Sequence, residues 1–330
     1  MRKVRVLSIL FVTLLLAVAV IAEAQQPTKI PRIGYISGTG NETNQGPYVE
    51  ALRQGLRELG YIEGKNFTIE YRGAEGKTDR IPSLTIELIE RQVNVLIVAT
   101  LPAILAAKQA TKTTPIIMVA SVDPVASKLV DSLAHPGGNL TGISTLAQDL
   151  NAKRLELLME VVPRLSRVAV LRDADSQFAT LQFKEYEAAA RVLKIELQSL
   201  DVRSANPDLE NAFLAATKGR NDALITITNA NLFVQQKRLA DLAIRNKLPS
   251  MFQGSTWVDS GGLMSYSTDE LGAFRRAAVY VDKILKGAKP ADLPVEQMTK
   301  FEFVINLKTA KQIGLNIPQS VLFRADKVIK

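Results

Sequence analysis

Residues 93–119 read VNVLIVATLPAILAAKQATKTTPIIMV, and this stretch decides the fold class. Val93 to Ala99 is an apolar run of the length of a buried strand, and Pro115 to Val119 is a second such run. Between them, Pro102 to Ala110 has a helical composition and follows a capping residue, Thr100. A strand, a helix and a strand in this order predict parallel strands joined by a crossover helix.

The same alternation continues on both sides of this unit. Further strands are predicted at Ile30 to Ile36, Phe67 to Tyr71, Arg167 to Leu171, Ile195 to Leu200, Ala223 to Ile227, Gly262 to Ser265 and Phe301 to Asn306. Further helices are predicted at Tyr48 to Leu59, Ile81 to Ile89, Ala152 to Val161, Phe178 to Leu193, Leu209 to Thr217, Leu232 to Arg245 and Phe274 to Leu285. Two such sets, joined near Gly142 to Asp149, predict an α/β fold of two similar lobes, each with a parallel sheet covered by helices on both faces.

The first 24 residues have the pattern of a secretory signal peptide. Arg2, Lys3 and Arg5 precede an apolar run from Val6 to Ala22, and Ala22-Glu23-Ala24 is a small-x-small cleavage pattern. We therefore expect export through the Sec pathway, with cleavage near Ala24 and a periplasmic mature protein. The alternative is an uncleaved N-terminal anchor.

The composition excludes several classes of function. The chain has 330 residues, no Cys and one His, so neither a disulfide-stapled module nor a zinc site with two or three His ligands is expected. His135 lies in a Pro-Gly-Gly loop, and a Ser-His-Asp triad is possible only if His135 serves as its base. We predict no metal, no catalytic group and no disulfide.

A nucleotide cofactor and a nucleic-acid partner are not expected either. Ser37-Gly38-Thr39-Gly40 resembles the start of a dinucleotide loop, but Thr43 stands where the third Gly is required. The formal net charge is +8, and Arg2, Lys3, Arg5 and Glu23 of the leader account for +2 of it. After the leader no Lys/Arg run is longer than two, so no basic nucleic-acid arm is predicted.

Candidate ligand-binding residues follow the predicted strands. In open parallel sheets ligands bind at the carboxyl ends of the strands, where helix N-termini present backbone N–H groups. The polar or aromatic residues predicted at or near these places are Ser37, Thr39, Thr100, Asp123, Thr228, Asn229 and Trp257.

Three of these positions have two interpretations each. Asp123 either faces a ligand ammonium or caps the turn at Pro124. Thr100 either donates to a ligand carboxylate or only caps its helix. Trp257, the single Trp, either lines a pocket or packs in the core.

Several runs together resemble one known family. They include Gly60-Tyr61-Ile62-Glu63-Gly64-Lys65-Asn66, Val122-Asp123-Pro124-Val125, His135-Pro136-Gly137-Gly138-Asn139-Leu140-Thr141-Gly142, Lys153-Arg154-Leu155-Glu156-Leu157-Leu158 and Gly261-Gly262-Leu263-Met264-Ser265-Tyr266. These runs, spread over nearly the whole mature chain, resemble the ABC transporter substrate-binding family that includes the tryptophan- and tyrosine-binding proteins.

The resemblance implies a type I periplasmic binding protein, in which two Rossmann-like lobes are joined by a three-crossover hinge. The implied N-terminal lobe is 27–143 with 268–300, and the C-terminal lobe is 144–267 with 301–330. It also implies a monomer that closes on an amino acid or related small molecule and delivers it to a membrane permease with its ATPase. A ligand-sensing module for a receptor uses the same lobes and is the alternative, and an exported α/β enzyme is a third reading.

Overall fold

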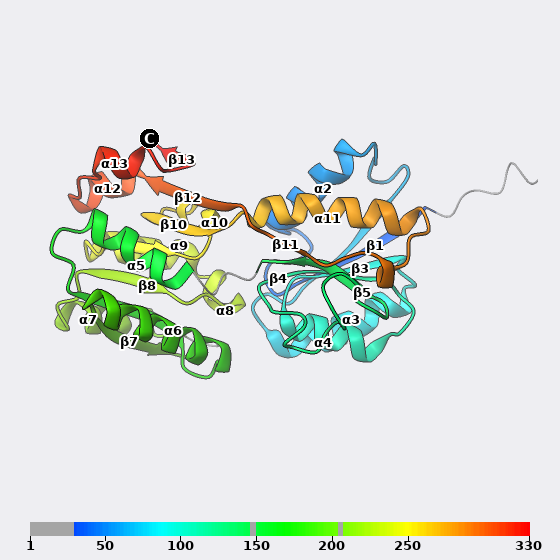
Figure 1. Cartoon of the computed structure of the whole chain (residues 1–330), viewed down its shortest axis with the longest axis horizontal. Coiled ribbons are helices and arrows are strands. Elements are labelled where there is room, and N and C mark those ends of the chain that lie inside the picture. The colour runs from blue at the N-terminus through cyan, green and yellow to red at the C-terminus, as the bar shows by residue number, and fades with distance from the viewer. Residues whose placement is uncertain (1–29, 146–149, 204–206) are drawn as a thin grey trace, which may run out of the picture.

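The computed structural model describes residues 30–145, 150–203 and 207–330. It contains two α/β lobes, each built on its own sheet, which lie end to end (Figure 1). The predicted signal peptide lies outside the described residues. Within them, no helix combines the length and the apolar character that a bilayer span requires.

The first lobe is built on a six-stranded sheet in the order β11-β5-β4-β3-β1-β2. All five neighbouring pairs are parallel. The strands are β1 (Arg32–Ser37), β2 (Thr68–Gly73), β3 (Val95–Val98), β4 (Ile116–Ala120), β5 (Leu140–Ser144) and β11 (Glu296–Gln297). The helices are α2 (Pro47–Glu58), α3 (Ile81–Glu90), α4 (Leu101–Ala110) and α11 (Glu270–Leu285), with 3-10 turns at Thr78–Arg80 and Pro290–Asp292.

The second lobe is built on a seven-stranded sheet in the order β13-β12-β10-β9-β8-β6-β7. Its strands are β6 (Arg167–Asp173), β7 (Glu196–Val202), β8 (Ala223–Thr226), β9 (Ser250–Phe252), β10 (Met264–Thr268), β12 (Phe301–Asn306) and β13 (Lys327–Ile329). Its helices are α5 (Leu150–Val161), α6 (Gln177–Leu193), α7 (Leu209–Lys218), α8 (Ala230–Phe233), α9 (Gln236–Arg245), α10 (Ser255–Asp259), α12 (Leu307–Ile313) and α13 (Gln319–Leu322). Among the described strands, β10 and β12 form the one antiparallel pair.

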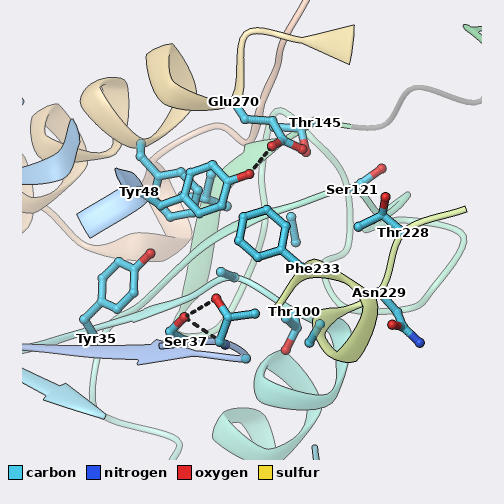
Figure 2. Close-up of a pocket in the computed structure, with 17 residues that line it drawn as sticks. Tyr35, Ser37, Tyr48, Thr100, Ser121, Thr145, Thr228, Asn229, Phe233 and Glu270 are labelled. Carbon is cyan, nitrogen blue, oxygen red and sulfur yellow. Dashed lines mark hydrogen bonds between the residues drawn. The ribbon is translucent and has the colours of Figure 1, made fainter. Parts of the chain in front are cut away.

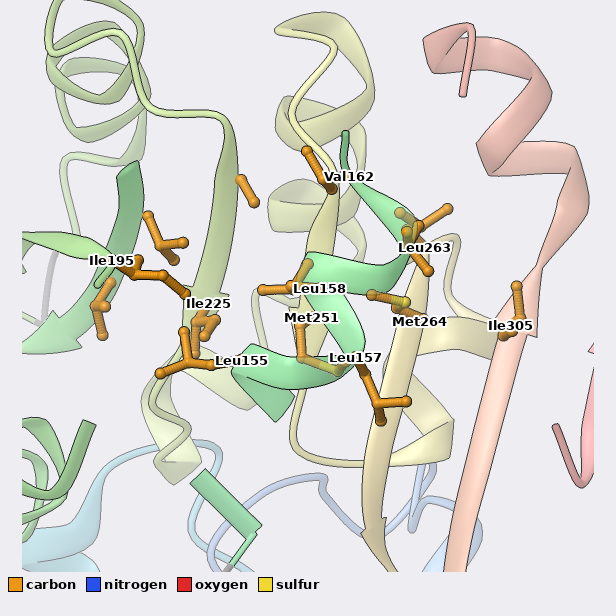
Figure 3. Close-up of a cluster of buried hydrophobic side chains, with 14 of the residues drawn as sticks. Leu155, Leu157, Leu158, Val162, Ile195, Ile225, Met251, Leu263, Met264 and Ile305 are labelled. Atoms are coloured by element: carbon orange, nitrogen blue, oxygen red, sulfur yellow. The ribbon is translucent and has the colours of Figure 1, made fainter. Parts of the chain in front are cut away.

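Each sheet is covered by apolar side chains on both faces. In the second lobe, Leu155 and Leu158 of α5 belong to the same buried cluster as Ile225 of β8 and Met251 of β9 (Figure 3). A separate cluster around Phe213 and Trp257 covers the opposite face. Burying each large aliphatic or aromatic side chain stabilises the fold by roughly 1.5–3 kcal/mol. This double burial explains why the central strands are continuous apolar runs.

The crossings between the lobes are hydrogen-bonded to one another. By the order of its described strands, the chain changes sheet between β5 and α5, between β10 and α11, and between β11 and β12. The Asp269 N–H donates to the Lys300 carbonyl at 3.0 Å, and the Met298 N–H donates to the Ser144 carbonyl at 2.9 Å. The crossing segments therefore lie side by side between the lobes.

The predicted fold class, an α/β protein with two sets of parallel strands, is confirmed, but several elements differ in extent. Residues 232–245, predicted as one helix, form α8 and α9 with a break at Val234 and Gln235. Helix α11 begins at Glu270, one turn before the predicted start, because the Asp269 side chain accepts the Gly272 N–H at 2.7 Å and caps the helix.

Candidate functional site

Two adjoining cavities lie in the cleft between the lobes. The first has a volume of about 200 Å³ and is lined mainly by the first lobe, including Tyr35, Ser37 and Thr100. The second has a volume of about 160 Å³ and is lined mainly by the second lobe, including Arg154, Gln253 and Ser267. They share Tyr48, Ser121, Thr145, Thr228, Phe233 and Glu270, so they form one continuous site.

The parallel sheets place polar residues in this cleft at the carboxyl ends of their strands. Ser37 ends β1, Ser121 follows β4 and Thr145 follows β5 in the first lobe. Thr228 follows β8 from the opposite side, and Thr268 ends β10. The cleft therefore lies at the carboxyl ends of the strands, where open α/β sheets generally bind their ligands.

Five of the residues predicted from the sequence line the first cavity: Ser37, Thr39, Thr100, Thr228 and Asn229 (Figure 2 labels four of them). The Thr39 N–H donates to the Ser37 hydroxyl oxygen at 3.1 Å, which orders this loop. Thr100 caps α4 by accepting the Ala103 N–H, and Asn229 caps α8 by accepting the Leu232 N–H. Thr100 and Asn229 thus face the cavity while they also hold helix N-termini.

Thr228 is notable because its hydroxyl oxygen is buried and has no hydrogen-bond partner among the described residues. It lines both cavities. A buried hydroxyl without a partner costs free energy, and a polar group of a ligand in the cleft would remove that cost.

The other two predicted residues lie elsewhere or play a different part. Asp123 lines neither cavity, and its carboxylate accepts the N–H groups of Val125 and Ala126 at 3.0 and 2.9 Å, so it acts as a turn cap. Trp257 lines the second cavity but is almost fully buried, and it stacks on Phe252 at a centroid distance of 4.9 Å. Trp257 therefore packs in the core and also forms part of the cavity wall.

Aromatic rings that sequence reasoning missed form the boundary between the two cavities. Tyr48 of α2 stacks on Phe274 of α11 at 4.9 Å, and Phe233 of α8 approaches Tyr48 at 5.9 Å. Figure 2 shows Phe233 in the middle of the labelled side chains. Because Tyr48 belongs to the first lobe and Phe233 to the second, this ring contact bridges the cleft. Phe233 also meets Trp257 edge-on at 5.9 Å.

The carboxylate of the cleft is Glu270, also missed from the sequence. It is the first residue of α11, and the Tyr48 hydroxyl donates to its Oε2 at 2.5 Å (Figure 2). Burial raises the pKa of the Glu270 carboxyl above its ordinary value, and the Tyr48 hydrogen bond opposes that rise. Burial and the neighbouring Glu270 raise the pKa of the Tyr48 hydroxyl well above its ordinary value, so Tyr48 remains a donor.

A sequence signal existed for Glu270 but not for the aromatic wall. Asp269 and Glu270 directly follow β10, so the rule that selected Ser37 and Thr228 applies to Glu270 as well. Tyr48 and Phe233 lie on helices whose position over the cleft depends on the tertiary fold. The described residues bring together no group of three His, Cys, Asp or Glu that is suited to a metal ion.

Comparison with known proteins agrees with this geometry. Residues 44–329 match the model of the family described as ABC transporter substrate binding protein. A "Tyrosine-binding protein" of Clostridioides difficile (strain R20291) is 26% identical over 261 residues, which cover 79% of this chain and 74% of that protein.

Solved structures of binding proteins are also similar to this chain. A domain from Streptococcus pneumonia, solved in complex with L-Trp, has a TM-score of 0.79 and 26% identity, and the match covers 91% of this chain and 99% of that one. A leucine binding protein from Thermotoga maritima has a TM-score of 0.53 at 15% identity, with 80% of this chain and 78% of that one covered, and thus shares the fold. The family match spans residues 44–329, most of the chain, so this chain belongs to the ABC transporter substrate binding protein family.

Proposed function

We propose that this protein is the periplasmic solute-binding component of an ABC importer, which closes its lobes on a small ligand and delivers it to a membrane permease and its ATPase. The observation that carries the proposal is the cleft itself. Polar strand ends and aromatic rings from both lobes converge there, and the cleft contains a buried hydroxyl, that of Thr228, with no partner among the described residues. In this function no bond of the ligand is made or broken, and the protein acts as a monomer.

Closure is proposed to occur about the crossing segments. The lobes are proposed as 27–143 with 268–300 and as 144–267 with 301–330. The segments around Thr145, Asp269 and Lys300 are short and hydrogen-bonded to each other, which favours rotation of the lobes as rigid bodies rather than loosening of either sheet. Export after cleavage near Ala24 would place the protein beside the permease.

The ligand is proposed to be an amino acid or a related small molecule. The proposed binding residues are those that line the cleft: Ser37, Thr39, Thr100, Thr228, Asn229 and Trp257, to which the structure adds Tyr48, Phe233 and Glu270. Glu270 takes the place of Asp123 as the acceptor for a ligand ammonium, because the carboxylate of Asp123 is engaged in its own turn. Relatives described as binding tyrosine and L-Trp support this ligand class.

The test combines binding, shape and transport. Calorimetry with the twenty amino acids and simple aromatic acids is expected to find at least one ligand, and small-angle scattering is expected to show a smaller radius of gyration with that ligand bound. Deleting the gene is expected to abolish uptake of the same compound by cells. Binding without any loss of uptake would contradict the import role, and a cytosolic location of the protein would contradict the proposal as a whole.

A further inference from the structure

The second cavity contains a buried cation whose charge is not balanced by a direct partner. Arg154 of α5 is 3% exposed. Its Nε donates to the Tyr266 carbonyl at 2.8 Å, and its Nη1 donates to Asn151 Oδ1 at 3.0 Å and to the Tyr186 hydroxyl at 3.4 Å. All of these acceptors are neutral.

No carboxylate among the described residues lies within ion-pair distance of this guanidinium, and its Nη2 has no hydrogen bond to any described residue. Two acidic groups belong to its surroundings: Glu185 accepts from the Asn151 amide, and Glu270 lines the same cavity, where the charge of Arg154 lowers the pKa of its carboxyl without a direct ion pair. Isolating a charge from water is unfavourable unless a counter-ion or several hydrogen bonds compensate. The neutral acceptors orient Arg154 but do not neutralise its charge.

Further donors line the same cavity. The Gln253 Oε1 accepts the Thr228 N–H at 3.1 Å, which leaves its Nε2 as a donor with no partner among the described residues. The hydroxyl of Ser267 lines the cavity too, as does that of Thr228. The cavity thus combines one cation and several neutral donors with a single carboxylate, Glu270, and the donors and the cation suit a small anion of one charge.

We propose that the second cavity is a carboxylate subsite in which Arg154 binds the acidic group of the ligand, while the apolar body of the ligand occupies the first cavity beside Tyr35, Tyr48 and Phe233. This inference rests on the proposed function. A single negative charge fits best, because Glu270 in the same cavity repels a dianion. Arg154 thereby selects carboxylates over their neutral amides.

The experiment uses compounds that differ only at the acidic group. Calorimetry at pH 7.5 compares L-tryptophan with L-tryptophanamide and tryptamine, and benzoate with benzamide, on wild type and Arg154→Gln. In wild type, a carboxylate is expected to bind about 30-fold or more tightly than its neutral counterpart, as expected for loss of one partner of a desolvated ion pair. In Arg154→Gln that ratio falls to near one.

The matched control is Arg72→Gln, because Arg72 lies outside the cleft and pairs with Glu87. It is expected to retain the wild-type ratio. If Arg154→Gln fails to fold, the test uses the ratio of carboxylate to amide affinity in wild type. It then also uses Ser267→Ala, in which that ratio is expected to fall by less than in Arg154→Gln.

Equal affinity of wild type for carboxylate and amide overturns the subsite and leaves the proposed function intact. Native mass spectrometry of the purified protein can detect a ligand that is not among these compounds. A retained small molecule with an acidic group supports the subsite. A retained small molecule without an acidic group overturns the subsite but not the proposed function. If no compound binds and none is retained, both the subsite and the proposed function are contradicted.

Discussion

The hydroxyl of Tyr48 donates a hydrogen bond of 2.5 Å to the carboxylate of Glu270, and these two residues, in the first turns of α2 and α11, lie 222 positions apart in the chain. The bond joins α2 to α11 at the edge of the cleft. It also offsets part of the cost of burying the Glu270 charge, since it lowers a pKa that burial raises.

Tyr48→Phe is therefore expected to destabilise the protein in a pH-dependent manner. Loss of the donor raises the pKa of Glu270 further, so the cost appears where the carboxylate is ionised and shrinks as pH falls into the ordinary carboxyl range. We expect a loss of about 1–3 kcal/mol at pH 8 and less at pH 4.5. Thermal melts at both pH values measure it, with Tyr266→Phe as control because the Tyr266 hydroxyl has no hydrogen bond to a described residue. An equal loss at both pH values would contradict this assignment.

Glu270→Gln is expected to flatten the pH dependence of stability. A carboxyl with a raised pKa in the folded state stabilises below its unfolded pKa, and that stability is lost as pH rises through the folded pKa. The variant lacks this slope, and denaturant titrations from pH 4 to pH 8 measure it. Glu296→Gln is the control with the opposite sign, since Arg276 lowers the pKa of Glu296. A variant whose pH profile matches that of wild type would contradict the prediction.

Gly142→Ala is expected to destabilise the first lobe by more than 2 kcal/mol. Gly142 has φ = +136°, and a Cβ there would lie 2.1 Å from the Met118 carbonyl oxygen of the neighbouring strand. Gly60→Ala is the matched control, because Gly60 has φ = +85° but an open surrounding, so it measures the backbone cost alone. Equal midpoints for the two variants in urea unfolding would refute the close-approach argument.

The intrinsic fluorescence of Trp257 can be used to detect a ligand in the cleft. It is the single Trp of the chain, it lines the second cavity, and it contacts Phe233. We expect the intrinsic emission to change in intensity or wavelength when a ligand occupies the cleft, and Trp257→Phe to abolish that change. The compound must first be shown by calorimetry to bind and must not itself fluoresce in this range. Unchanged emission at saturation would place the ligand away from this wall.

Much of the fold could be predicted because most of the buried parallel strands are apolar runs long enough to recognise. The strands that were not predicted lack that signal. Leu140–Ser144 has Gly142 at its centre, Ser250–Phe252 and Lys327–Ile329 have three residues each, and Glu296–Gln297 has two. Strand β12 pairs with β10 in the antiparallel sense. That direction depends on how the chain returns from the first lobe to the second, and no local sequence pattern encodes it.

The residues of the candidate site also fall into those that a local sequence signal identifies and those that it does not. Ser37, Thr100 and Thr228 follow recognisable strands, so the strand-end rule finds them. Tyr48, Arg154 and Phe233 lie on helices, and only the packing of those helices brings them to the cleft. Asp123 also follows a predicted strand, so the strand-end rule selects it. Only the structure shows that its carboxylate accepts the N–H groups of its own turn instead of facing the cleft.

Helix α11 and strand β11 complete the first lobe from the far end of the polypeptide. Helix α11 lies so close to α2 that a Cβ on Gly55 would come within 2.4 Å of the Arg275 carbonyl oxygen. During synthesis, the initial 145 residues therefore emerge from the ribosome long before the pieces that cover them. Because the apolar side of α2 packs against α11, we expect the first lobe to complete its folding only after residues 270–297 have been made.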